Sequence, residues 1–461
     1  MTQPMTPPRP MTASLLPVSA LLLGVAILLV GAGLQGILVP MRATIEDFGT
    51  ITIGLLMTAY WIGFVLSCFA TPVIVRRVGH IRTFAVLAAI ASAVVLVLAL
   101  VTDPVVWMAL RAISGFSLAG LAMVVESWLN EKATNDTRGR IFSIYMVINL
   151  LAVTIGQLML PLGDPAQFPL FAVVSVAITL SLVPIGLTRS AAPQPIAEVK
   201  LRPSRLYEMS PAGVAGCFFV GLSNGAFGGL GPVFATREGL SIAGVALFMS
   251  IAVIGGAFAQ YPLGRISDLM DRRRVMLVVS FAAVVVAAAL ALAGAQVEPI
   301  QELMRQLPIS PQALFIVLAG LLGAFIYPLY ALCVAHTNDY VGGQNFVEAS
   351  GGLMLTYGLG SVVGPLLAAV LIETNGASGL FIFVALVHIA LGAFLSYRMR
   401  ERVAIPASAR PEFVNAPTLR ATPAAAALDP RAQEPPAAPP PSQPPPTQQP
   451  PKQEPPVGHA A

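Results

Sequence analysis

The chain has 461 residues, of which 56% are hydrophobic and only 10% are charged, and its mean hydropathy is +0.79. A soluble protein of this size needs about a quarter of its residues charged to cover its surface. The composition therefore excludes a soluble protein and predicts that most of the chain lies in lipid. The net charge of +4 does not indicate nucleic-acid binding, because the basic residues concentrate on alternate loops.

Apolar runs recur between residues 15 and 397, about twelve in all, and each is long enough to cross a hydrocarbon core of about 30 Å as a helix. The apolar core of the first run is longer than that of a signal peptide, so this run is predicted to be a retained membrane helix. In chain order the runs are 15–40, 51–74, 83–102, 105–128, 141–163, 168–187, 211–234, 241–263, 275–294, 312–335, 347–372 and 378–397.

The basic residues predict the orientation of these helices. If the N-terminus is cytoplasmic, the outside loops hold only Arg42, Arg237 and Arg305. By the positive-inside rule this bias predicts a multi-pass protein of a bacterial inner membrane with both termini in the cytoplasm. The inside segments then hold Arg9, Arg76, Arg77, Arg82, Lys132, Arg138, Arg140, Arg189, Lys200, Arg202, Arg205, Arg265, Arg272, Arg273, Arg274, Arg398, Arg400 and Arg402.

The chain divides into two similar halves at a polar, proline-containing stretch. "GILVPMRATIEDFGTITIGLLM" around Pro40 resembles "GGLGPVFATREGLSIAGVALFM" around Pro232, and Pro72 matches Pro262. Two such halves predict an all-α membrane protein with a parallel repeat of two pseudo-symmetric six-helix bundles. The predicted units are a cytoplasmic segment at 1–14, bundles at 15–187 and 211–398, and a cytoplasmic linker at 188–210.

Beyond the last apolar run the composition changes to proline, alanine and glutamine. Text such as "PPAAPPPSQPPPTQQPPKQEPPVGHAA" cannot bury a core and favours polyproline II or coil. Residues 399–461 are therefore predicted to be a disordered cytoplasmic tail, and a proline-rich ligand for an adaptor is the alternative reading.

Patterns that carry catalytic chemistry do not occur in the sequence. Cys68, Cys217 and Cys333 lie inside predicted spans and share no ligand spacing, so they are predicted to be packing residues and neither disulfide partners nor metal ligands. There is no nucleotide-binding loop and no catalytic triad spacing. We therefore expect no enzymatic activity, no cofactor and no metal.

The stretch "GRISDLMDRRR" packs six charges into residues 264–274, on a predicted inside loop. It resembles the signature loop of the major facilitator superfamily, which has the form Gly, three residues, Asp, a basic residue, any residue, Gly and two basic residues. The positions that match are Gly264, Asp268, Arg272 and Arg273, whereas Asp271 stands where the family prefers Gly.

The first half carries a degenerate copy of this loop, "PVIVRRVGHIR". It keeps Gly79, Arg77 and Arg82 but places Arg76 at the Asp position and a proline at the first Gly position. "ALRAISGFSLAG", with Arg111, is similar to the family's helix-4 pattern. "VVESWLNEKATNDTRGRIFSIYMV" looks like the YcaD-like branch, whose members are largely of unassigned substrate.

The resemblance implies roles for the charged loops. Asp268 is expected to accept bonds from the amides that open helix 5, near "NDTRGR", and the arginines to bind anionic headgroups. Together they would latch the halves on the inside in the outward-open state. In the first half the corresponding latch would be Arg76 or Arg77 with Glu348.

Few polar groups lie inside the predicted spans. Arg111 lies at a depth of about 10 Å, given a rise of 1.5 Å per residue, and an arginine there costs about 2.5–3.5 kcal/mol. It must therefore face a cavity or a partner, either as an anchor for a substrate anion or in proton coupling, or as a structural arginine. The resemblance favours Glu126 as a relay partner of Arg77 or Arg82, with a coupling carboxylate as the alternative.

Four further side chains are candidates for substrate contact, because they lie on helices that line the cavity in this superfamily. These side chains, with ordinary packing as the alternative for each, are Gln35, Asn224, Tyr327 and Tyr330. The two tyrosines flank Pro328, where a proline kink can turn them toward the cavity.

These observations predict a secondary active transporter that moves a small neutral or anionic solute across the membrane by alternating access. Its partners would be the solute, the lipid bilayer and, where transport is coupled, H⁺ or Na⁺. A multidrug exporter is the first alternative, disfavoured because no Asp or Glu occupies the middle of a predicted span. A receptor or scaffold that acts through its proline-rich tail is the second.

Overall fold

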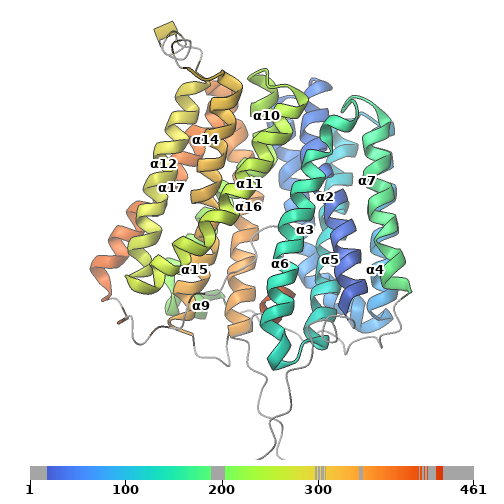
Figure 1. Cartoon of the computed structure of the whole chain (residues 1–461), viewed down its shortest axis with the longest axis horizontal. Coiled ribbons are helices and arrows are strands. Elements are labelled where there is room, and N and C mark those ends of the chain that lie inside the picture. The colour runs from blue at the N-terminus through green and yellow to red at the C-terminus, as the bar shows by residue number, and fades with distance from the viewer. Residues whose placement is uncertain are drawn as a thin grey trace, which may run out of the picture.

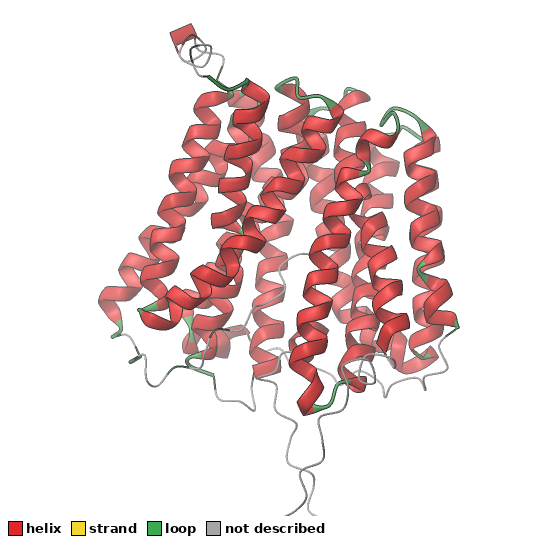
Figure 2. Cartoon of the chain, in the orientation of Figure 1, coloured by secondary structure: helices red, strands yellow, loops and turns green. Residues whose placement is uncertain are grey.

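The computed structural model describes residues 18–187, 203–295, 308–341 and 346–403, with short pieces at 298–299, 302, 306, 405–406, 410, 413 and 422–428. Within these ranges every regular element is a helix (Figure 2). Twelve helices or helix pairs are long and apolar enough to cross a membrane. The predicted segment 1–14 and residues 188–202 of the predicted linker lie outside the described residues.

All twelve predicted spans are confirmed as helices, arranged as two bundles side by side (Figure 1). The first bundle contains α2 Ser19–Ile45, α3 Thr50–Val78, α4 His80–Leu100, α5 Pro104–Lys132, α6 Asn135–Leu158 and the consecutive α7 Phe168–Leu180 and α8 Leu182–Gly186. The second contains α10 Pro211–Arg237, α11 Ile242–Leu269, α12 Arg272–Ala293, α14 Pro311–Ile326, α15 Pro328–Asn338, α16 Phe346–Asn375 and α17 Gly379–Glu401. The short helices are η2 Leu160–Leu162, α9 Pro203–Met209 and η5 Pro423–Leu428.

Helices continue further into the charged loops than hydropathy predicts. The stretch at residues 264–274 is mostly helical, since α11 runs to Leu269 and α12 begins at Arg272. Only Met270 and Asp271 lie between them, and the Asp271 carboxylate caps α12 by accepting from the amide of Arg273 at 3.0 Å. Charge ends a hydrophobic run but not the backbone hydrogen bonding, so the connection between the two helices is shorter than the predicted loop at 264–274.

The two ends of the helices define two faces of the protein. The face that carries Arg76, Arg77, Arg82, Lys132, Arg265, Arg272, Arg273, Arg274, Arg398 and Arg400 is called the basic face below, and the other the opposite face. Gly79 makes the turn between α3 and α4 on the basic face with φ of +85°, a conformation that glycine adopts without steric cost.

The same helix pairs pack closely in both bundles. A Cβ atom on Gly63 of α3 would lie 1.9 Å from the carbonyl oxygen of Ala112 on α5, and one on Gly323 of α14 would lie 1.9 Å from that of Ala252 on α11. Small residues let membrane helices approach backbone to backbone. The second and fourth spans of each half are therefore joined in the same way, as expected of an internal repeat.

Part of the predicted tail is ordered against the bundles. Residues 399–401 complete α17, and η5 lies between the two bundles with Thr422 and Leu428 fully buried. The prediction of a disordered tail is therefore wrong for these residues, because Ala425 and Leu428 find apolar surface to bury. Most of the remaining tail lies outside the described residues.

Candidate functional site

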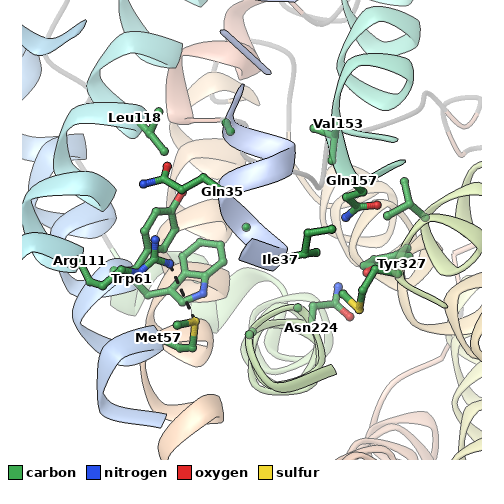
Figure 3. Close-up of a pocket in the computed structure, with 18 of the residues that line it drawn as sticks. Gln35, Ile37, Met57, Trp61, Arg111, Leu118, Val153, Gln157, Asn224 and Tyr327 are labelled. Carbon is green, nitrogen blue, oxygen red and sulfur yellow. Dashed lines mark hydrogen bonds between the residues drawn. The ribbon is translucent and has the colours of Figure 1, made fainter. Parts of the chain in front are cut away.

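A cavity of about 120 Å³ lies between the two bundles and is lined by both of them. Residues of α2, α3, α5 and α6 form one side, and residues of α10, α11 and α16 form the other, together with Tyr327 where α14 ends (Figure 3). The position fits the place where the substrate sites of transporters with two parallel repeats are found, near the midplane at the interface of the repeats.

Arg111 brings a positive charge into this cavity. Its guanidinium lies 4.5 Å from the centre of the Tyr60 ring, and Nη2 lies 3.9 Å from Sδ of Met57. The cation–π contact and the weak thioether acceptor stabilise the guanidinium on the cavity wall. No acidic side chain is among the described residues that line the cavity.

Next to Arg111, α2 and α5 are joined by a polar contact. Nε2 of Gln35 donates to Oγ of Ser114 at 3.2 Å, and both side chains are buried. This bond leaves the carbonyl oxygen of Gln35 and one amide hydrogen for another partner. Trp61 covers the same part of the cavity (Figure 3).

Across the cavity, Asn224 of α10 supplies an amide. The residue is 5% exposed, and neither Oδ1 nor Nδ2 reaches hydrogen-bond geometry with another described residue, although the Tyr357 side chain lies close enough to interact with it. A solute group that bonds this amide would satisfy it better than that contact does. Tyr327, where α14 ends, and Gln157 of α6 line the cavity near Asn224 (Figure 3).

The cavity accounts for four of the five predicted contact residues. It is lined by Arg111, Gln35, Asn224 and Tyr327, but Tyr330 does not line it. Tyr330 follows the break at Pro328 and packs against Tyr357 of α16, with ring centres 5.2 Å apart. The prediction that Tyr330 faces the cavity is wrong because α15 turns its ring toward α16.

Several lining residues were not predicted from the sequence. They come from α3, α6 and α16 and are Met57, Tyr60, Trp61, Gln157 and Tyr357. Side chains with polar atoms are infrequent within these spans. The sequence could therefore have indicated two of these positions, the adjacent aromatic pair at 60–61 and the glutamine at 157.

The second signature stretch is a buried ion network on the basic face. Arg272 is 1% exposed, and its Nε lies 3.1 Å from Oδ2 of Asp339 while Nη1 lies 3.1 Å from Oδ1 of Asp268. Arg273 pairs with Asp271 at 2.8 Å and donates to the carbonyl oxygen of Arg402.

This burial corrects the prediction that the loop arginines bind headgroups. Arg274 is exposed, whereas Arg272 and Arg273 are buried and form ion pairs with carboxylates. Burial raises the pKa of Asp339 to about 6, against the lowering effect of Arg272. Burial also raises the pKa of Asp271, but the hydrogen bonds from Arg273 outweigh it and hold that pKa below its ordinary value.

Asp268 has a different partner from the one that the resemblance implies. Its Oδ1 accepts a hydrogen bond from the backbone amide of Phe413 at 2.9 Å and pairs with Arg272. Among the described residues it accepts no bond from the start of α6. In this structure the bundles meet on the opposite face, and the expected contact stays a prediction.

The first signature stretch shows no latch in this state. Glu348 makes no ion pair or hydrogen bond with a described residue, and Arg76, Arg77 and Arg82 are exposed. Glu126 bonds neither Arg77 nor Arg82. It accepts from the Tyr145 hydroxyl at 2.7 Å and from Thr422 of the tail, so the predicted relay is absent from this structure.

On the opposite face the two bundles are in direct contact. Nη2 of Arg237 donates to Oγ1 of Thr50 at 2.9 Å, and the hydroxyl of Thr58 donates to the carbonyl oxygen of Val362 at 2.8 Å. Deeper in, Ser250 of α11 donates to Gln157 of α6 at 3.2 Å. These bonds close the cavity toward the opposite face.

Glu238 caps the end of α10 on this face. Its raised pKa leads us to expect that the stability of the protein depends on pH. Burial raises the pKa of Glu238 from its ordinary 4.5 to about 7, so the folded protein binds this proton more tightly than the unfolded chain. The contribution to stability is complete below pH 4.5 and is lost as the pH rises through 7. We expect Glu238→Gln to reduce the fall in Tm between pH 5 and pH 8, measured in detergent. The control is Glu373→Gln at an exposed position, and an unchanged slope in Glu238→Gln contradicts the prediction.

Comparisons with known proteins agree with this architecture. The family model described as "Major Facilitator Superfamily" matches residues 21–301 and 214–428. An uncharacterized MFS-type transporter of Enterobacter sp. (strain 638) is 29% identical over 356 residues, which cover 76% of this chain and 87% of the relative. The uncharacterized MFS-type transporter YcaD of Escherichia fergusonii is 28% identical over the same shares.

Solved structures show the same fold at low sequence identity. The nucleoside transporter NupG superposes with a TM-score of 0.69 at 13% identity, covering 83% of this chain and 99% of its own. A bacterial homolog of the human lysosomal transporter Spinster, in an inward-facing and occupied conformation, gives a TM-score of 0.64 at 14% identity over 85% and 97% of the two chains.

Proposed function

Because this chain belongs to the major facilitator superfamily and is an integral, multi-pass membrane protein, we propose that it is a secondary active transporter of a small anionic or neutral solute. The observation that carries this proposal is the cavity between the bundles, whose described lining contains the Arg111 cation and no acidic side chain. A basic side chain inside a membrane-spanning bundle marks a substrate pathway, a relay or a structural contact, and the position of Arg111 on the wall of the cavity favours the first of these.

The lining supports recognition of a carboxylate or similar oxyanion. The guanidinium of Arg111 can form charge-assisted, two-pronged hydrogen bonds with such a group, and Gln35 keeps polar capacity beside it. Asn224 can bond a second polar group of the solute from across the cavity.

Transport by alternating access is proposed from the arrangement of the two faces. Contacts on the opposite face close the cavity, while the bundle ends on the basic face are bridged by the tail. By the positive-inside rule the basic face is cytoplasmic and the membrane is the bacterial inner membrane, with both termini in the cytoplasm. The structure then corresponds to an inward-facing state, and rocking of the bundles exposes the cavity to the other side.

Cationic drug efflux receives no support from the cavity. A lipophilic cation needs a carboxylate or an uncharged aromatic cage, whereas Arg111 would repel it. Coupling to H⁺ or Na⁺ belongs to this class of transporter, and Glu126 is the one Asp or Glu residue that is fully buried among the described residues. We therefore propose an anion or a neutral polar metabolite as the cargo.

The test is thermal stabilisation of the purified protein by a panel of small carboxylates, sugars, amino acids and lipophilic cations. A ligand of the folded state at 100 times its Kd adds about 2.7 kcal/mol to the free energy of unfolding. We expect an anion to raise the Tm of the wild type and of Arg82→Ala, an exposed control, but not of Arg111→Ala. Stabilisation by cations that is indifferent to Arg111 would return this residue to a structural role and favour the exporter.

A further inference from the structure

The segment at 422–428 re-enters the protein between the bundles, 21 residues after the last membrane helix ends at 401. It contacts α5 and α6 of the first bundle and α16 of the second (Figure 1, red). Thr422 and Leu428 are 0% exposed and Ala425 is 1% exposed. The segment is therefore seated in the cleft that opens toward the basic face.

The first residue of the segment is held by a buried carboxylate. The amide of Thr422 lies 3.3 and 3.2 Å from the two oxygens of Glu126, and its hydroxyl donates to Oε2. The Tyr145 hydroxyl donates to Oε1 at 2.7 Å. Glu126 is 0% exposed, so these donors replace the water that a carboxylate in an open cleft would bind.

Apolar contacts complete the seat on both sides. Leu428 joins the main hydrophobic core, which contains residues of both bundles, whereas Ala425 joins a second cluster built by α10, α12, α15, α16 and α17. One short helix thus buries side chains against two separate cores. Small side chains suit a narrow cleft, and four consecutive alanines occupy 424–427.

Two contacts earlier in the tail guide it toward the cleft. Arg410 donates to the carbonyl oxygen of Met270 at 2.6 Å, and the Phe413 amide donates to Asp268 at 2.9 Å. The Phe413 ring lies over Gly264, where a Cβ atom would come within 2.2 Å of it. The tail therefore contacts both Gly264 and Asp268, two residues of the signature stretch.

From this arrangement we propose that residues 422–428 are an internal ligand of the basic-face cleft and hold the bundles apart there. The proposal rests on alternating access. A segment that holds the bundles apart inhibits transport only if the basic-face ends of α5, α6 and α16 must approach each other during the cycle. A ligand that binds one conformation shifts the population toward it. The tethered segment acts at a high effective concentration and must leave before the basic face can close.

The decisive comparison is between two truncations. Removing 429–461 keeps the segment, and removing 422–461 deletes it, while both keep Arg410 and Phe413. Spin labels at Ser143 on α6 and Arg274 on α12, both exposed, report the distance between the bundles on the basic face. Labels at Gln167 and Glu373, also exposed, report the opposite face, and the native cysteines are replaced by alanine in every variant.

We expect the chain that lacks 429–461 to match the full-length protein on both faces. The chain that lacks 422–461 is expected to gain a population with a shorter distance on the basic face and a longer one on the opposite face. A peptide with residues 419–430, "LRATPAAAALDP", added to that chain should restore the original distances. Identical distance distributions for the two truncations would overturn the proposal.

A full-length variant covers the case in which the shorter chain does not fold. Thr422→Val removes the hydroxyl donor to Glu126 but keeps the side-chain size, and we expect it to shift the distances in the same direction by a smaller amount. Thr374→Val, on the exposed end of α16, is its control. The distances between the spin labels are measured without solute. Their result is therefore independent of whether Arg111 binds a substrate. The proposal would be contradicted if a folded Thr422→Val variant showed the same distances as the wild-type full-length protein and if excess peptide did not change them.

Discussion

A Gly54→Trp variant is expected to be held with its opposite face open. A Cβ atom at position 54 would lie 2.6 Å from Cβ of Ala369 and 3.0 Å from the carbonyl oxygen of Pro365 on the other bundle. An indole cannot fit there while α3 and α16 stay in contact, since protein interiors have no room for an added ring. The labels at Gln167 and Glu373 should therefore report a longer distance than in the wild type.

The control for this experiment is Gly49→Trp, five residues away. At Gly49 a Cβ atom would meet only the Thr52 hydroxyl at 3.8 Å, so the added ring projects into open space. We expect this control to keep the wild-type distances. Equal distances in the two tryptophan variants would show that the contact between α3 and α16 does not close the opposite face.

Replacing Arg272 by methionine is expected to destabilise the protein by about 3–5 kcal/mol, the cost of leaving one partner of a buried ion pair alone. The uncompensated group is Asp339, whose side chain is 3% exposed. Thermal unfolding in detergent would measure the loss. Arg274→Met, at the exposed neighbouring position, should change the Tm little.

A double variant separates charge from packing in this network. Arg272→Met combined with Asp339→Leu removes both buried charges, and apolar replacement of a whole pair is often neutral. We expect the double variant to recover most of the Tm lost in Arg272→Met. If it loses the sum of the two single effects instead, the two residues are independent and the pair does not stabilise the fold.

The sequence predicted the helices well because lipid leaves few choices. An apolar run in hydrocarbon must satisfy its own backbone, so each one becomes a helix, and all twelve predicted runs did. Helix ends were less predictable, as at Leu269 and Arg272, where charged residues remain helical. The side-chain bond of Asp271 that starts α12 depends on local geometry that hydropathy does not contain.

The cost of a polar residue in lipid placed two side chains on the cavity wall, whereas their contact with a substrate stays a prediction. Arg111 and Asn224 are too polar to face hydrocarbon, and both line the cavity. Site prediction failed for Tyr330, since an aromatic ring is equally stable in a cavity or in a core. The bonds of Thr422 to Glu126 and of Phe413 to Asp268 could not be predicted, because both residues belong to a tail whose composition indicates disorder.

The order of synthesis has a bearing on that tail. A ribosome releases the chain from its N-terminus, and domains form in that order, so α2 to α16 leave the ribosome before residues 422–428 do. The bundles can therefore begin to assemble around an empty cleft. The chain that lacks 422–461 should then already be resistant to extraction and protease once it is released, and seating of 422–428 would be the last step of maturation.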